Sequence, residues 1–295
     1  MSATAFDKSA YSASMPRQLF GYNVVEFLGE GAGSKLYVVT DPTTRKLLAL
    51  KHVVREKDKD IRFVEQLEAE FEVSKQFRHA GLRRTIDLKI KKNLFLRVVE
   101  AALILELVEG VTLDQQQPPN LADMLQVFIG TAAALAEMHR LGFVHCDLKP
   151  NNILISSGGQ VRVIDYGQTC KTGTVKERIQ GTPDYISPEQ VRCEPVTNRT
   201  DIFNLGATMY WGLTTKKIPT LFNIKKSENS FLVDSKVAAP HELNPNIPEP
   251  LSHLVMDCCR TNPSKRPAEM AEIARRLETM HFGLTHKHPA PQHVA

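Results

Sequence analysis

One short polar stretch constrains this chain more than any other. It reads HCDLKPNN over 145–152 and runs into an apolar segment over 153–155. An acid, a cation and an amide stand close together here as Asp147, Lys149 and Asn152. Phosphoryl transfer suits such a set, because it depends on positioning and charge neutralisation more than on covalent chemistry. Asp147 could accept a proton from a hydroxyl, Lys149 could neutralise phosphate charge, and Asn152 could hold a divalent cation.

A second acidic residue follows a short way along the chain. The strand-like run VRVI over 161–164 leads directly to Asp165, Tyr166 and Gly167. A carboxylate at the end of that strand would supply another oxygen ligand for the same cation. The sequence therefore predicts a metal-assisted site built from two neighbouring loops.

These two motifs resemble those of protein kinases, namely the catalytic loop H-R-D-L-K-x-x-N and the metal-binding D-F-G. Cys146 stands where the family has Arg, and Tyr166 stands where it has Phe. Both motifs occur in the family order and at the usual distance. The resemblance covers roughly residues 20–280. It implies an α+β protein with the two-lobed protein kinase fold, a small β-rich N-lobe and a larger, mainly helical C-lobe.

The glycine-rich stretch 29–39 fits the nucleotide loop of the family, G-x-G-x-x-G-x-V. Gly29 and Gly31 match, whereas Ser34 replaces the third glycine and Leu36 replaces the valine. Glycines allow backbone N–H groups to approach phosphate oxygens closely. Most glycine-rich turns are simple hairpins. This one indicates a nucleotide-binding loop because it stands directly before the next kinase-like motif.

Lys51 lies within the apolar strand 47–54, where a cation is costly unless it meets an anion. The resemblance supplies two anions, the ATP phosphates and a glutamate of the next helix. That helix is predicted over 61–78, and its exit at 79–82 selects Glu70 as the partner, with Glu65, Glu68 and Glu72 as the alternatives. Ser74 falls where the family has an apolar residue, which suggests weak docking of this helix.

The resemblance also implies where the nucleotide base binds. The stretch 103–110 resembles the strand and hinge where adenine binds, with Leu105 as gatekeeper and backbone contacts from Glu106 to Val108. Residues 121–141 are predicted to form a buried helix that leads to His145, since apolar residues recur there at helical spacing. The nucleotide-binding set comprises Leu28, Gly29, Gly31, Ser34, Leu36, Ala49, Lys51, Leu105, Glu106, Val108 and Leu154.

Residues 168–189 resemble an activation segment and its closing motif, GTPDYISPE, which is typical of Ser/Thr protein kinases. Asp201 resembles the buried aspartate that braces the catalytic loop. Arg266 matches the family arginine that pairs with the glutamate of the closing motif, here Glu189. The resemblance therefore implies Asp147 as catalytic base, Lys149, Lys51 and Glu70 as further catalytic residues, and Asn152 and Asp165 as metal ligands.

The expected organisation is a flexible leader over 1–20, an N-lobe over 21–108, a C-lobe over 109–281 and a flexible tail over 282–295. The implied activity is ATP-dependent phosphorylation of Ser or Thr on a protein substrate, with ATP and Mg²⁺, or Mn²⁺ in its place, as cofactors. The short, insert-poor layout is most like the bacterial eukaryotic-type Ser/Thr kinases.

The composition of the chain gives no indication of a nucleic-acid-binding protein or a membrane protein. The chain has 295 residues and a net charge of +4 without a long basic run, so nucleic-acid binding is not indicated. It has no run of 18 apolar residues, so no membrane segment is expected. Five cysteines without a framework spacing favour a cytoplasmic setting. The sequence does not indicate an oligomeric state.

Two alternative functions stay open at this point. One is a pseudokinase acting as a nucleotide-binding scaffold, which the departures at Ser34, Ser74 and Cys146 would permit. The other is a small-molecule phosphotransferase on the same fold. The complete activation segment, together with Glu189 and Arg266, favours a protein kinase over the second alternative.

Overall fold

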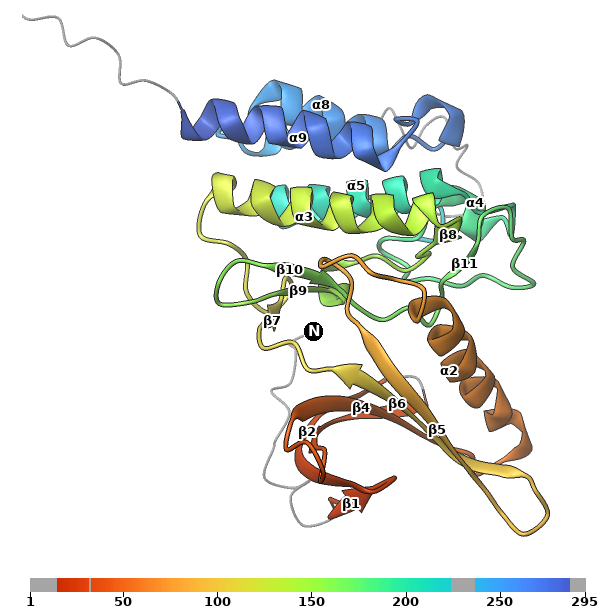
Figure 1. Ribbon diagram of the computed structural model, residues 1–295. Coiled ribbons are helices and arrows are strands. Elements are labelled where there is room, and N and C mark those ends of the chain that lie inside the picture. Colours follow the sequence, from red (N-terminus) through yellow and green to blue (C-terminus); the bar gives the residue numbers. More distant parts are fainter. Residues whose placement is uncertain (1–14, 32, 224–236, 287–295) are drawn as a thin grey trace, which may run out of the picture. The chain divides into compact units, whose positions relative to one another are not determined.

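The computed structural model describes residues 15–31, 33–223 and 237–286. The chain divides into two compact units (Figure 1). The first runs to Gln76 and includes Arg83–Leu107, and the second combines Phe77–Leu82 with the chain from Val108 onward. The first unit is rich in strands and the second is mainly helical, as the two-lobed kinase fold predicts. Most of the expected leader and tail, 1–14 and 287–295, lies outside the described residues.

The first unit is one antiparallel sheet with the strand order β1-β2-β3-β4-β6-β5 within the described residues. Helix α2 lies along one face of this sheet and packs on β5 and β6 (Figure 1). The elements are β1 (Gln18–Leu19), β2 (Tyr22–Gly31), β3 (Ser34–Thr40), β4 (Leu47–Val54), η1 (Asp58–Asp60), α2 (Ile61–Ser74), β5 (Thr85–Lys92) and β6 (Val98–Glu106).

Both faces of this sheet are apolar in its central strands, because successive side chains of a strand point to opposite faces. Leu50 and Ile104 pack on one face with no exposed surface. Leu103 packs on the other, where Val64 and Leu67 of α2 cover it. The apolar face of α2 therefore packs on the sheet. This packing determines which α2 side chains point toward the strands.

The second unit is built around helix α3, which packs against α5, α9 and the small sheet β10-β9-β7. In Figure 1, α8 and α9 form a layer beside α3 and α5. The elements are β7 (Val111–Thr112), α3 (Leu121–Arg140), β8 (Phe143–Val144), η2 (Pro150–Asn152), β9 (Ile153–Ile155), β10 (Val161–Val163), β11 (Cys170–Lys171), α4 (Pro188–Val191), α5 (Asn198–Thr214), α7 (Pro240–Leu243), α8 (Glu249–Cys258), η3 (Pro263–Lys265) and α9 (Met270–Thr285).

Helix α3 begins where the Asn120 side chain accepts a hydrogen bond from the backbone N–H of Asp123, which is a standard N-cap. By length and composition α3 is the one described helix that could cross a membrane. Its residues Leu125, Phe128 and Leu135 have no exposed surface inside the second unit. Helix α3 is thus the core helix predicted over 121–141.

Three boundaries differ from the predictions. Strand β1 pairs with β2 and buries Leu19, so the end of the expected leader joins the sheet. Helix α9 continues to Thr285, into the expected tail. Helix α2 ends at Ser74, four residues before its predicted end at 78.

Candidate active site

Lys51 and Glu70 form an ion pair inside the first unit. The Lys51 Nζ atom lies 2.7 Å from Glu70 Oε2, and the glutamate side chain has no exposed surface. Glu70 lies on the buried stripe of α2 that includes Leu67 and Ser74, positions three and four residues away. Helical geometry therefore selects Glu70 over the three alternatives that the sequence left open.

One face of the sheet gathers several of the predicted nucleotide-binding residues. Leu36 lies opposite Lys51 across β3 and β4, and Ala49 lies opposite Leu105 across β4 and β6. Because Ala49 and Lys51 are two residues apart, they share a face. Leu36, Ala49 and Leu105 belong to one apolar cluster. The register thus places an apolar surface beside the ammonium group of Lys51.

The glycine-rich stretch forms the hairpin between β2 and β3, in which Gly31 pairs with Ser34 and Gly29 with Leu36. The tip residue at position 32 lies outside the described residues. Gly33 has a φ of +79°, and a Cβ there would lie 2.6 Å from the ring of Phe63 on α2. Only glycine fits this position, because both the backbone angle and the close ring exclude a side chain.

The hinge strand offers less backbone than the resemblance implied. The N–H of Glu106 donates to the carbonyl of Arg84 at 3.0 Å. Of the backbone groups of Glu106, only the carbonyl oxygen could therefore bind the nucleotide base. Leu105, the predicted gatekeeper, has no exposed surface in the unit. Leu28 is 46% exposed, and Val108 is half-buried and starts the next segment of the second unit.

The second unit holds Asp147 at the centre of a compact polar triangle. Lys149 Nζ donates to Asp147 Oδ2 at 2.8 Å and to Thr182 Oγ1 at 2.7 Å. The Thr182 hydroxyl donates to Asp147 Oδ1 at 2.7 Å. A hydroxyl oxygen therefore lies against both a carboxylate and an ammonium group. Sequence reasoning did not assign Thr182 to the site.

Asn152 connects the catalytic loop to the second acidic motif. Its side-chain amide donates to the backbone carbonyl of Asp147 at 2.8 Å, and its backbone carbonyl accepts from the N–H of Ile164 at 3.0 Å. Asp165 follows at the end of β10 with a φ of +65°, a left-handed conformation that few residues adopt. Leu154 lies on β9, paired with β10. The two predicted metal ligands thus belong to adjoining, hydrogen-bonded segments.

Asp201 braces the catalytic loop as the resemblance implied. Its carboxylate accepts hydrogen bonds from the backbone N–H groups of His145 at 2.8 Å and Cys146 at 2.9 Å. A third contact was not expected, a 2.8 Å bond between Asp201 Oδ2 and His139 Nε2. These bonds hold Cys146 at a φ of +65°, one residue before Asp147.

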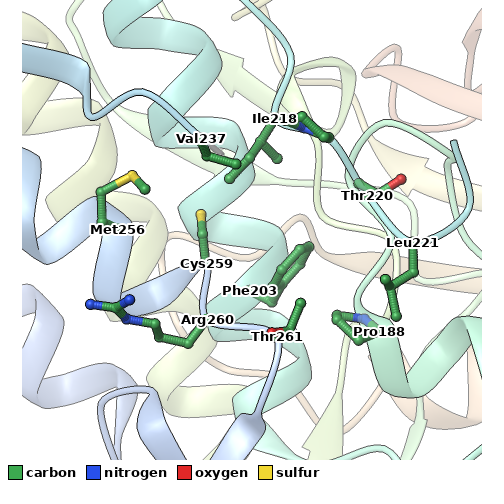
Figure 2. Close-up of a pocket in the computed structure, with 11 residues that line it drawn as sticks. Pro188, Phe203, Ile218, Thr220, Leu221, Val237, Met256, Cys259, Arg260 and Thr261 are labelled. Carbon is green, nitrogen blue, oxygen red and sulfur yellow. The ribbon is translucent and has the colours of Figure 1, made fainter. Parts of the chain in front are cut away.

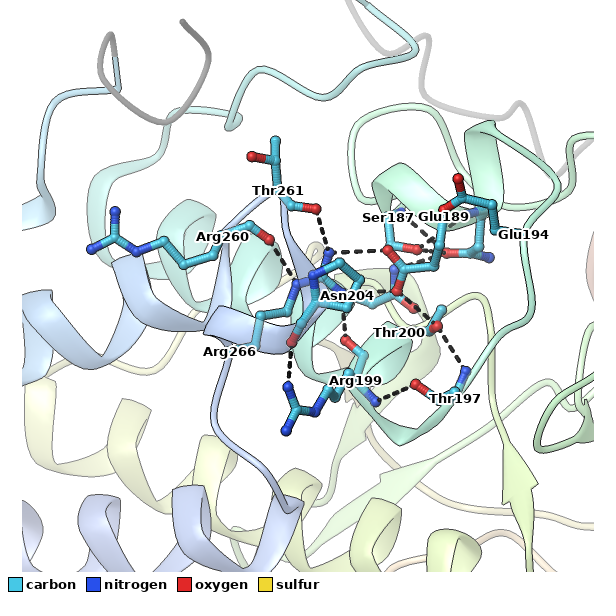
Figure 3. Close-up of polar contacts among 12 residues, drawn as sticks. Ser187, Glu189, Glu194, Thr197, Arg199, Thr200, Asn204, Arg260, Thr261 and Arg266 are labelled. Atoms are coloured by element: carbon cyan, nitrogen blue, oxygen red, sulfur yellow. Dashed lines mark hydrogen bonds and ion pairs between the residues drawn. The ribbon is translucent and has the colours of Figure 1, made fainter. Parts of the chain in front are cut away.

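The closing motif of the activation segment is anchored by a buried ion pair (Figure 3). Arg266 contacts Glu189 through two parallel bonds of 2.8 and 3.0 Å, and both residues are almost fully buried. The remaining Arg266 protons reach backbone carbonyls, including Arg260 at 2.7 Å and Arg199 at 2.8 Å. Thr200 also donates to Glu189. Such bidentate, fully bonded pairs are the strong class of ion pair.

Ser74 does not leave helix α2 with an unsatisfied group. Its side chain is buried, and its Oγ accepts from Thr85 Oγ1 at 2.5 Å while donating to the Phe71 carbonyl at 3.3 Å. A polar residue can replace an apolar one at such a place when its bonds are satisfied. Ser74 therefore gives no reason to expect weak docking of helix α2 in this unit.

Comparison with known proteins agrees with the geometry. The protein kinase domain matches residues 22–277. The chain is 26% identical over 267 residues to a probable serine/threonine-protein kinase of Clostridium acetobutylicum, covering 88% of this chain and 40% of that protein. It is 24% identical over 289 residues to the serine/threonine-protein kinase PknD of Chlamydia pneumoniae, covering 88% and 31%. It is 25% identical over 268 residues to PrkC of Bacillus subtilis, covering 88% and 40%.

The chain spans two fifths or less of the length of these three relatives. Their shared part is the kinase domain, which accounts for most of this chain. The glycine-rich hairpin, the Lys51–Glu70 pair, the Asp147 loop and the Glu189–Arg266 pair all occur within that matched segment. This chain belongs to the protein kinase family and is similar to its bacterial Ser/Thr members.

Proposed function

We propose that the chain transfers the γ-phosphoryl group of ATP to Ser or Thr hydroxyls of protein substrates. The observation that carries this proposal is the triangle of Asp147, Lys149 and Thr182. In this triangle the Thr182 hydroxyl oxygen lies within hydrogen-bond distance of the Asp147 carboxylate and of the Lys149 ammonium group. An acceptor hydroxyl in that position would lose its proton to Asp147, while Lys149 stabilises charge on the phosphoryl group.

The oxygen donors of the second unit suit Mg²⁺, which binds proteins through one or two carboxylates and keeps several waters. Asn152 holds its amide by donating to the Asp147 carbonyl, so its side-chain oxygen would be the atom that reaches a cation. Asp165 would supply the carboxylate. When bound, the ion would neutralise charge on the phosphates. Lys51, held by Glu70, would contact phosphate oxygens.

Neither alternative function gains a supporting observation. The pseudokinase alternative rested on Ser34, Ser74 and Cys146, but Lys51, Asp147, Asn152 and Asp165 are all present and the Lys51–Glu70 pair is formed. A small-molecule phosphotransferase would have no evident use for an activation segment anchored by a buried ion pair. The proposal of a protein kinase therefore uses more of the observed contacts than either alternative.

Lys51→Met tests the nucleotide half of the proposal. Phosphoryl transfer to protein should fall by at least about 10²-fold, since a preorganised charge on the transferring phosphate is lost. The chain should still fold, because the apolar side chain of methionine can pack where the aliphatic stem of Lys51 packs in β4. The measurement is initial rate with radiolabelled ATP, with Lys46→Met on the exposed β3–β4 turn as the control. Near-normal turnover in Lys51→Met would show that this assignment is wrong.

Asp165→Ala tests the metal assignment. Titration calorimetry should show that Mg²⁺ strengthens ATP binding to the wild type and no longer does so in the variant, because the carboxylate ligand is gone. Asp58→Ala, which removes a 94% exposed carboxylate, should behave as wild type. Equal ATP affinities for wild type and Asp165→Ala, with and without Mg²⁺, would contradict a metal role.

We also propose that phosphorylation of Thr169, Thr172 or Thr174 is not required for activity. In kinases with Arg before the catalytic base, that Arg receives the activation-segment phosphate, and the pairing orders the segment. Here the position is Cys146, whose neighbours Val144 and Val196 are apolar.

Two nearby cations of the segment are already engaged. Lys176 donates to the carbonyl of Gln168 at 2.9 Å, and Lys171 lies over the ring of Phe143 at 3.6 Å. After phosphatase treatment, the triple Thr→Ala variant at positions 169, 172 and 174 should phosphorylate an external protein at close to the wild-type rate. A loss of more than about tenfold with an intact fold would contradict this proposal.

A further inference from the structure

Two cysteines from different segments meet beside the catalytic loop. Cys146 Sγ and Cys170 Sγ lie 3.7 Å apart, although 24 residues separate them in the sequence. Cys146 is buried next to Asp147, and Cys170 is half-buried on β11 at the start of the activation segment. Both pack with Val144 and Val196. The mechanism proposed above uses neither thiol.

Strand pairing accounts for this proximity. Strand β11 runs antiparallel to β8, and Cys170 lies opposite Val144, two residues before Cys146. A disulfide has an S–S length of about 2.0 Å, so the two sulfurs would need to approach by about 1.7 Å. Cys146 is held by Asp201 through its N–H and by Gln190 through its carbonyl. The two-residue strand β11 is therefore the part that would move.

The surroundings of the two thiols differ, and they favour Cys170 as the nucleophile and Cys146 as its partner. The pKa of Cys170 is lowered to about 7, chiefly by the hydrogen bond from Cys146 and also by the charge of Lys176 and a bond from Thr174. The bond to Cys170, burial and the charge of Asp201 raise the pKa of Cys146. Cys170 is thus partly thiolate at neutral pH, and the thiolate is the reactive form.

We propose that Cys146 and Cys170 form a reversible disulfide in the folded protein, an oxidation site that joins the catalytic loop to the activation segment. With a peroxide as oxidant, the Cys170 sulfur attacks one peroxide oxygen and becomes a sulfenic acid, and the other oxygen leaves as water. The Cys146 sulfur then attacks the Cys170 sulfur, and a second water leaves. The two thiols lose two hydrogen atoms, and the peroxide is reduced to two waters.

The disulfide should also stiffen the start of the activation segment. In the reduced protein β11 is a strand of only two residues, supported by bonds such as Thr172 N–H to the Gly142 carbonyl at 3.0 Å. A covalent link to Cys146 would limit the local opening that exposes these amides. Slower hydrogen exchange at Cys170 to Thr174 would therefore accompany oxidation, and reduction should reverse it.

The test is peptide mapping of the whole folded chain. The reduced wild type is treated with hydrogen peroxide, blocked at its remaining thiols, digested without reductant and analysed by mass spectrometry. A peptide pair containing Cys146 and Cys170, lighter by two hydrogen atoms and separated by dithiothreitol, is expected. Catalysis plays no part in this measurement, so its outcome is independent of the proposed activity.

The other cysteines serve as internal controls. Cys258 is fully buried, and burial raises its pKa well above the ordinary value. Cys259 lines a small, mostly apolar pocket, where its sulfur lies among Ile218, Val237 and Met256 (Figure 2). Both should remain thiols, and Cys193→Ser should leave the Cys146–Cys170 link unchanged.

Two variants make the outcome decisive. Cys146→Ser should trap Cys170 as a sulfenic acid, detected with a dimedone-type probe, because the resolving thiol is gone. Cys170→Ser should leave Cys146 as a thiol under the same treatment. The proposal is overturned if folded wild type gives no Cys146–Cys170 peptide pair while Cys170 is oxidised further, or if the pair arises only after unfolding in urea.

Discussion

Arg266→Ala is expected to destabilise the second unit by about 3–5 kcal/mol, the cost of removing one partner from a buried ion pair. Glu189 would be left buried without the two bonds that its carboxylate now receives from Arg266. Three backbone carbonyls, those of Arg199, Arg260 and Thr261, would lose a donor at the same time. In a domain of this size the loss corresponds to a fall in Tm of roughly 6–20 °C.

The measurement is thermal and urea unfolding of Arg266→Ala beside Arg192→Ala. Arg192 lies 3.9 Å from Glu194 in a largely exposed pair, and its removal should change stability by less than about 1 kcal/mol. Arg266→Lys should fall between the two, since lysine keeps the charge without the bidentate geometry. Equal Tm values for Arg266→Ala and the wild type would show that the pair does not stabilise the fold.

The same pair gives the stability a defined pH dependence. Burial would raise the pKa of Glu189, but its bonds and charge interaction with Arg266 outweigh burial and lower it. A carboxylate with a lowered pKa in the folded state stabilises the protein above its unfolded-state pKa, and this contribution is lost as the pH falls through the folded-state value. The stability gap between wild type and Arg266→Ala should therefore narrow under acidic conditions.

The parts of this protein that short-range patterns specify could be predicted from the sequence. Helix α3 follows from its apolar spacing, and the catalytic loop and the closing motif follow from residues close together in the chain. The distance from the helix exit at 79–82 selected Glu70 as the Lys51 partner among four glutamates, and the ion pair confirms that choice. The structure adds the physical reason, because residues 64, 67 and 74 are buried on the same face of α2 as Glu70.

Contacts between distant segments could not be predicted in the same way. Thr182 is 35 residues from Asp147, and nothing in its local sequence indicates a bond to that carboxylate. The approach of Cys170 to Cys146 depends on the register of β11 against β8, two strands of two residues each. Such short strands carry no alternation from which pairing could be inferred. Strand β1 escaped prediction for the same reason.

Asp147→Asn is expected to have the largest effect on catalysis. Asparagine has nearly the same shape and can still accept a hydrogen bond from Thr182, so the fold and its Tm should be retained. It cannot take a proton from an acceptor hydroxyl, and it removes the negative partner of Lys149. Loss of a general base typically costs 10²–10⁴-fold in rate, and a fall in protein phosphorylation of that order is expected.

Asn151→Asp and Asn151→Ala are useful neighbours for comparison, because Asn151 is exposed and its side chain points to Asp114 instead of Asp147. Both should lower the rate far less than Asp147→Asn. This contrast separates loss of the base from a general disturbance of the catalytic loop.

The most direct test of the central claim is transfer of label from radiolabelled ATP to Ser or Thr of an external protein substrate. The rate is measured for wild type and for Asp147→Asn, after thermal unfolding has shown that the two proteins have the same Tm. The account predicts labelled phosphoserine or phosphothreonine with the wild type and a rate lower by at least about 10²-fold with the variant. Wild type that labels no protein, labels only a small molecule, or is matched by Asp147→Asn would contradict it.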